Sequence, residues 1–197
     1  MVLYTGAYGL VVEPDRATQD KVGHLVEACA YDAQFVTPVP HLTLYHTTLS
    51  DAPEGEVRRI LKSCNAALPR GTKIPLGPVA PFDKFLFWDA IWKENQDLIR
   101  LLWRAHHLAL GLADHRDQGV LNGRQAEEKL NLSAEQEKNV KRYGHPLVGA
   151  QWRPHLTLAY DPNGFKGPYP GNPHTMEVVA VRFVRIGQFG SVAGVIF

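Results

Sequence analysis

Two histidines of this 197-residue chain, His41 and His155, lie in identical pentapeptides with the sequence Pro-His-Leu-Thr-Leu. Each histidine precedes a threonine by two positions, so on a strand each imidazole shares a face with a hydroxyl, Thr43 in the first copy and Thr157 in the second. An identical repeat of this length is expected by chance on the order of 0.01 to 0.02 times in such a chain. The repeat therefore predicts one site built from both segments.

These four side chains suit chemistry at phosphorus. In-line cleavage of a phosphodiester needs a base on the attacking oxygen and an acid on the departing oxygen, and histidine, with an ordinary pKa of about 6.5, serves either role at neutral pH. Thr43 and Thr157 would donate hydrogen bonds to the non-bridging oxygens as charge develops there. The scheme requires neither a metal nor a cofactor, and we expect none. The candidate catalytic residues are therefore His41, Thr43, His155 and Thr157.

Other side chains on these strands are candidates for contact with a substrate. Tyr45 shares the predicted face of Thr43, and Arg153 shares that of His155, where its guanidinium would bind phosphate in a bidentate manner. Candidates for stacking on a nucleobase are Tyr8, Phe82 and Trp88. The competing interpretation is structural, because strand aromatics commonly pack in a core and strand arginines commonly lie at a solvated edge.

Hydrophobic periodicity predicts a mixture of strands and helices. The expected strands are 2–12, 38–49, 73–79, 84–92, 151–160, 175–187 and 191–197. The expected helices are 16–31, a second that opens near Pro53, and 94–112. Strands and helices do not alternate regularly, so we expect an antiparallel α+β fold and not a doubly wound parallel sheet.

The stretch 114–149 differs from the rest of the chain because it is polar and charged. Within it, Ser133 and Gln136 have the spacing of a capping box at the start of a short exposed helix. We interpret the stretch as a helical insertion. Its charged run, 124–142, forms either a solvated helical face or a lid that closes over the substrate.

The paired His-x-Thr segments, each preceded by Pro and followed by an apolar residue, resemble the signature of the 2H phosphoesterase superfamily. That group includes the bacterial RNA 2',3'-cyclic phosphodiesterases, also called 2'-5' RNA ligases. The order of the expected elements is similar over most of the chain, and the stretch 114–149 is the departure from the compact bacterial members. The resemblance implies a two-lobed antiparallel α+β fold with pseudo-twofold symmetry, in which both motifs line a central cleft.

The resemblance also implies a reaction. It is metal-independent chemistry on 2',3'-cyclic phosphates or 2'-5' linkages, in which His41 and His155 take the acid and base roles and Thr43 and Thr157 contact the phosphate. The sequence does not tell which histidine is the acid.

The overall charge limits the partners. Lys and Arg number 21 and Asp and Glu 20, so the net charge of +1 provides no field to hold a long polyanion or an anionic membrane. We therefore expect a nucleotide or an RNA end as the substrate, with no extended nucleic acid and no membrane. No apolar run approaches the roughly 18 residues of a spanning helix, and the apolar N-terminus is typical of a strand and not of a signal peptide. With two cysteines and no secretory prelude, we expect a cytoplasmic monomer whose residues 1–197 form one bilobal domain.

Two other functions compete with a phosphodiesterase. A non-catalytic protein could use the same cleft to bind a nucleotide or an RNA terminus. A metal hydrolase built on His41 and His155 is disfavoured, because no carboxylate lies at ligand spacing near either motif. A regular strand would also turn His46 away from His41.

Overall fold

The computed structural model describes residues 2–91, 94–119, 132–167, 169 and 173–197. The strands are β1 (Leu3–Pro14), β2 (Phe35–Val36), β3 (Leu42–Pro53), β4 (Lys73–Phe82), β5 (Phe85–Ala90), β6 (His155–Tyr160), β7 (His174–Ile186) and β8 (Val192–Val195). The α-helices are α1 (Arg16–Cys29), α2 (Glu54–Ala67), α3 (Gln96–Ala109) and α4 (Ala134–Tyr143). Short 3-10 helices are η1 (Leu110–His115), η3 (Gly149–Gln151) and η4 (Gln188–Gly190).

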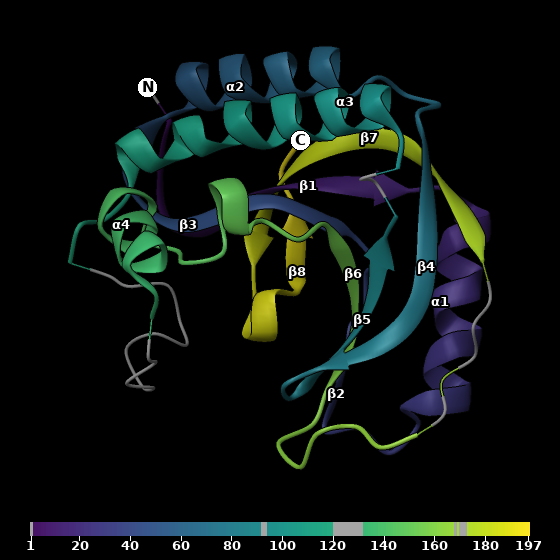
Figure 1. Ribbon diagram of the computed structural model, residues 1–197. Coiled ribbons are helices and arrows are strands. Elements are labelled where there is room, and N and C mark those ends of the chain that lie inside the picture. The colour runs from purple at the N-terminus through teal and green to yellow at the C-terminus, as the bar shows by residue number, and fades with distance from the viewer. Residues whose placement is uncertain (1, 92–93, 120–131, 168, 170–172) are drawn as a thin grey trace.

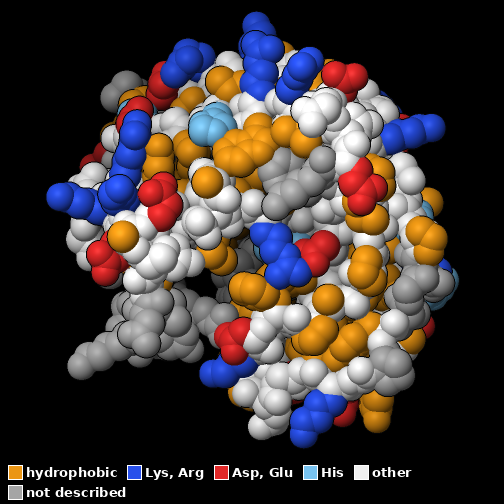
Figure 2. All heavy atoms as spheres, viewed as in Figure 1, with side chains coloured by type: hydrophobic (Ala, Val, Ile, Leu, Met, Phe, Trp, Pro, Cys, Tyr) orange, Lys and Arg blue, Asp and Glu red, His pale blue; other side chains and the backbone are white. Residues whose placement is uncertain are grey.

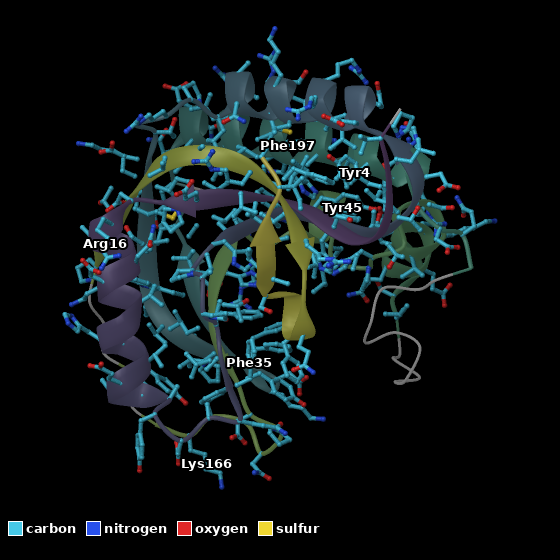
Figure 3. All side chains as sticks on the ribbon, turned by 180° about the vertical axis from the view of Figure 1, so that it is seen from behind. Tyr4, Arg16, Phe35, Tyr45, Lys166 and Phe197 are labelled. Carbon is cyan, nitrogen blue, oxygen red and sulfur yellow. The ribbon has the colours of Figure 1, made fainter. Side chains whose placement is uncertain are left out.

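The described strands form one antiparallel sheet in the order β1-β3-β6-β5-β4-β7-β8, with β2 paired to β6. β1 pairs with β3 along one edge and with β7 along the other, so six strands close into a ring. One half of the ring consists of β1, β3 and β7, and the other half of β4, β5 and β6. The halves join where β4 pairs with β7 and where β3 meets β6. In both Figure 1 and the reverse view of Figure 3, the β7–β8 hairpin overlaps the middle of the ring.

Helices cover the sheet on the side away from the predicted site. α2 and α3 lie side by side over the half with β1, β3 and β7, and α1 packs against β7 and β6 (Figure 1). Leucines of both pentapeptides belong to the core beneath them, with Leu42 and Leu156 at 0% exposure. The alternating residues of the same strands therefore face the inner side of the ring. None of the described helices is both long enough and apolar enough to span a membrane.

The predicted antiparallel α+β fold is confirmed. Its two lobes are halves of one continuous sheet and not two separate sheets. The predicted helix after Ser133 is also present as α4, and the capping box forms in both directions, from Gln136 N–H to Ser133 Oγ and from Ser133 N–H to Gln136 Oε1. Residues 120–131 of the predicted insertion lie outside the described residues.

Several element boundaries differ from the predictions. β3 continues to Pro53, which delays α2 to Glu54. The predicted strand at 151–160 begins only at His155, because η3 precedes it. The short strand β2 was not predicted, since two residues are too few to show a period.

Candidate functional site

The two pentapeptides lie side by side where the halves of the ring meet. Leu42 of β3 and Leu156 of β6 are direct partners in an antiparallel pairing. Each histidine therefore lies next to the threonine of the other copy, on the inner side of the sheet. Two distant segments thus supply two imidazoles and two hydroxyls to one location.

Both imidazoles are held in the same way. His41 Nδ1 donates to the carbonyl of Val39 (2.8 Å), and His155 Nδ1 donates to the carbonyl of Arg153 (2.7 Å). Because a carbonyl only accepts, each neutral ring carries its proton on Nδ1 and presents the basic lone pair at Nε2. Burial lowers the pKa of His155 to about 4 and also lowers the pKa of His41, so both rings are neutral near pH 7.

The surroundings of His155 are aromatic and charged. Its ring stacks on Phe87, with centroids 3.7 Å apart. Arg153 Nε donates to Asp89 (2.8 Å), and the guanidinium lies over the ring of Phe82 at 5.0 Å. Burial is the main cause of the lowered pKa of His155, and the charge of Asp89 opposes it. Arg153 and Phe82 thus border the second histidine, and both are partly exposed.

The surroundings of His41 are more enclosed. This side chain is only 4% exposed, and the backbone of Gly190, in η4 between β7 and β8, lies close to its ring. The ring of the neighbouring Phe189 stacks on that of Tyr160, with centroids 4.1 Å apart, and its centroid lies 5.2 Å from that of Phe35. Figure 3 shows Phe35 below the tip of this hairpin. The hairpin tip therefore covers the first histidine and is held there by aromatic contacts.

A β-bulge in β3 overturns one predicted contact. Two consecutive residues of β1 pair with Tyr45 and Thr43, which leaves Leu44 unpaired and shifts the alternation of side chains. Tyr45 is 2% exposed, lies beneath the long helices (Figure 3) and donates its hydroxyl proton to the carbonyl of Tyr143 (2.5 Å). The prediction that Tyr45 shares the face of Thr43 and touches substrate is therefore wrong.

The same bulge brings His46 towards His41, which also corrects the prediction from a regular strand. Burial, together with the nearby His41, lowers the pKa of His46 to about 4. Its ring contacts that of His145, with centroids 5.1 Å apart. Burial lowers the pKa of His145 to about 3, with smaller effects from neighbouring imidazoles that include His155. Sequence reasoning missed this pair, because only the pairing of β3 with β1 reveals the bulge.

The loop that carries His145 is fixed at several points. Asn139 of α4 donates to the carbonyls of Pro146 and Val148. His106 of α3 accepts a hydrogen bond from Gly149 N–H (3.0 Å) through Nε2, while its Nδ1 donates to the carbonyl of Leu44. The end of the predicted insertion is thereby joined to β3 next to the first pentapeptide.

Two aromatic candidates belong to the core. Tyr8 is 9% exposed and stacks on Phe183 at 5.1 Å. Trp88 is fully buried, and its Nε1 donates to the carbonyl of Gly77 (2.7 Å). The prediction that either ring reaches a nucleobase is wrong, because both belong to the main hydrophobic core. Phe82 and the unpredicted Phe87 are the aromatic rings that lie near His155.

Within the described ranges, no three His, Cys, Asp or Glu side chains are arranged to hold a metal ion. Cys29 and Cys64 are both free thiols.

Crystal structures of known proteins share the fold of this chain over nearly its whole length. One, described as a phosphoesterase, superposes with a TM-score of 0.59 at 13% identity and covers 97% of this chain and 94% of its own. The chain shares the fold of this protein. The complex of E. coli LigT with NADP+ superposes with a TM-score of 0.55 at 11% identity and covers 95% of this chain and 92% of LigT. The complex of LigT with phosphate superposes with a TM-score of 0.54 at 12% identity and covers 95% of this chain and 91% of LigT. No protein family profile and no curated protein sequence matches the chain.

Proposed function

We propose that this protein is a metal-independent phosphodiesterase that opens 2',3'-cyclic phosphates or cleaves 2'-5' linkages on nucleotides or RNA ends. The main support is the equivalent placement of His41 and His155, which lie in adjacent strand segments and both present Nε2 after fixing Nδ1 on a carbonyl. The complexes of LigT with phosphate and with 3'-AMP show that a protein of this fold binds such groups.

The proposed reaction uses only side chains of the two pentapeptides. One Nε2 takes a proton from the attacking water or hydroxyl as the new P–O bond forms, and the other imidazolium protonates the oxygen that leaves as the old P–O bond breaks. The anionic phosphate stabilises the imidazolium that acts as the acid, against the effect of burial. Thr43 and Thr157 donate to the non-bridging oxygens. In the described part of the chain, neither hydroxyl bonds to another protein group, so both are available.

Hydrolysis assays in excess chelator test this proposal. The panel contains the four 2',3'-cyclic nucleotides and 2'-5'-linked dinucleotides, and chromatography distinguishes 2'-phosphate from 3'-phosphate products. We expect His41→Ala and His155→Ala each to lose at least about 100-fold in kcat. The matched control is His24→Ala, which removes an exposed imidazole of α1 and retains activity. If either site variant keeps wild-type kcat, or if chelator abolishes activity, the proposal is wrong.

A second candidate function is a non-catalytic protein that binds a nucleotide or an RNA terminus in the same site. The enclosure of His41 under the β7–β8 hairpin tip favours it, because a covered imidazole is poorly placed for turnover. Calorimetric binding of a panel compound by folded wild-type protein, without any hydrolysis, would support this function over the phosphodiesterase.

The distribution of charge agrees with a small substrate or a chain end. Acidic and basic side chains are interspersed on the face shown in Figure 2. Such a surface does not provide the continuous basic track that an extended nucleic acid requires.

A further inference from the structure

His46 lies on the inner side of β3, next along the strand from Thr43. Thr43 pairs with Val11 of β1, which lies outside the main core. Across the bulge, His46 pairs with Gly9, two residues before Val11 and therefore on the same side of β1. A β-carbon on Gly9 would lie 2.9 Å from the β-carbon of His46, which is closer than two such atoms pack. Glycine at this position therefore leaves room for His46 on the inner side of the ring.

The loop between α4 and β6 brings a further imidazole, His145, to the same place (Figure 1). The rings of His145 and His46 are in contact, with centroids 5.1 Å apart. Further along the loop, Trp152 Nε1 donates to the carbonyl of Thr43 (3.2 Å). The loop therefore runs along β3 at the level of Thr43 and His46, and Thr43 is the threonine that lies next to His155. His145 is thus close to both pentapeptides.

His145 carries its proton on a different ring nitrogen from the two pentapeptide histidines. The N–H of Leu147 donates to Nδ1 of His145 (3.1 Å). A ring nitrogen that accepts a hydrogen bond bears no proton, so the neutral ring carries its proton on Nε2. His41 and His155 present a lone pair at Nε2, whereas His145 presents an N–H donor there.

This N–H is available to a ligand. In the described part of the chain, no group accepts a hydrogen bond from Nε2 of His145, and this nitrogen is not among the buried polar atoms that lack a partner. It is therefore accessible to solvent. The loop around it is fixed, because Asn139 donates to the carbonyls of Pro146 and Val148. A donor held in place before the substrate arrives stabilises developing charge without the cost of reorientation.

The ring of His145 also keeps its proton. Burial, with smaller effects from His46, His106 and His155, lowers the pKa of His145 to about 3, so this imidazole is neutral near pH 7. The N–H of a neutral imidazole is a very weak acid. It therefore acts as a hydrogen-bond donor to an oxyanion and not as a proton source.

We propose that His145 is a third catalytic imidazole, which donates from Nε2 to a non-bridging oxygen of the phosphate between the two pentapeptides. This inference rests on the proposed phosphodiesterase function and adds to it a group from outside the pentapeptides. Each phosphate oxygen accepts more than one hydrogen bond, so this donor acts together with Thr43 and Thr157. The stretch 114–149 thereby contributes a catalytic group to the site.

Two substitutions separate the N–H from the ring. His145→Phe keeps a flat ring without the donor, whereas His145→Gln keeps an N–H near the position of Nε2. On the panel substrate that wild type hydrolyses fastest, we expect His145→Phe to lower kcat about 100-fold with KM within about threefold. We expect His145→Gln to retain kcat within about tenfold of wild type. His24→Phe, at an exposed site on α1, is the matched control and keeps wild-type kcat. Thermal unfolding verifies that each variant is folded.

Two kinetic results would overturn the inference. Wild-type kcat in His145→Phe would leave its N–H without a role in the reaction. Equal losses in His145→Phe and His145→Gln would make the ring a structural support and not a donor.

A measurement without turnover separates this inference from the proposed function. In ¹⁵N-labelled protein, the NMR signal of the Nε2 proton of His145, identified by its loss in His145→Gln, should shift as inorganic phosphate is added. The Nδ1 proton of His106, which donates to the carbonyl of Leu44, is the internal control and should shift much less. If wild-type protein hydrolyses no panel compound, the proposed function fails, and this shift alone decides whether His145 binds phosphate. An unshifted signal would overturn the inference even in an active enzyme.

Discussion

The two copies of the pentapeptide have the same sequence and fix their histidines by the same hydrogen bond, yet their surroundings differ. His155 stacks on Phe87 beside the pair formed by Arg153 and Asp89. His41 lies under the β7–β8 hairpin, against the backbone of Gly190. Local sequence therefore sets the orientation of each ring, whereas elements far away in the sequence set its environment.

Three other imidazoles with lowered pKa values lie near the first copy. His46 follows it on β3, His145 contacts His46, and His106 bonds to the carbonyl of Leu44. Burial lowers the pKa of His46 and His106 to about 4 and that of His145 to about 3. The first copy is thus the part of the molecule in which neutral histidines are most concentrated.

The largest effect expected from this difference is on the pH dependence of stability. Between about pH 6.5 and pH 4 the unfolded chain binds protons that these buried rings do not, so the free energy of unfolding is greatest above pH 6.5 and falls as the pH is lowered. Each histidine contributes up to about 1.4 kcal/mol per pH unit. Urea unfolding between pH 7 and pH 5 measures the slope.

Two variants assign that slope to particular histidines. His145→Gln should reduce the slope of the free energy of unfolding against pH by the equivalent of about one proton. His24→Gln, at an exposed site, should leave that slope unchanged. An unchanged slope in His145→Gln would mean that this imidazole is not held neutral.

The threonines provide the next largest test. Thr43→Val and Thr157→Val keep the shape of each side chain and remove its donor, and we expect each to lower kcat about 100-fold, as for other donors to a developing oxyanion. Thr175→Val, exposed on β7, is the control. Similar losses would show that both threonines contact the phosphate. A variant that keeps wild-type kcat would show that its threonine has no part in the mechanism.

A smaller effect should distinguish the two histidines. The charge of Asp89 raises the pKa of His155 against burial, so Asp89→Asn should lower that pKa further. The limb of the pH profile of kcat/KM that reports His155 then moves to lower pH, while the limb of His41 stays. Asp20→Asn, on the exposed face of α1, is the matched control. A shift of both limbs, or of neither, would contradict the assignment of separate environments.

Short-range patterns were predictable from the sequence and pairings between distant strands were not. The repeat identified the adjacent segments, and the capping box of Ser133 formed as its spacing required. The bulge at Leu44 arises from the partner strand β1, so the positions of Tyr45 and His46 could not follow from period two alone. On β5, aromatic rings occur on both faces, which is why alternation did not reveal that Trp88 is buried and Phe87 faces the site.

The central position of β1 has a consequence for folding during synthesis. One edge of β1 pairs with β3, which follows soon after it in the sequence. The other edge of β1 pairs with β7, which is synthesised near the end of the chain. Until then one edge of β1 remains unpaired, and an unpaired strand edge promotes association between chains. Such long-range closure also slows folding. A chaperone that shields this edge would therefore be expected to increase the yield of folded protein more than one that acts on the helices.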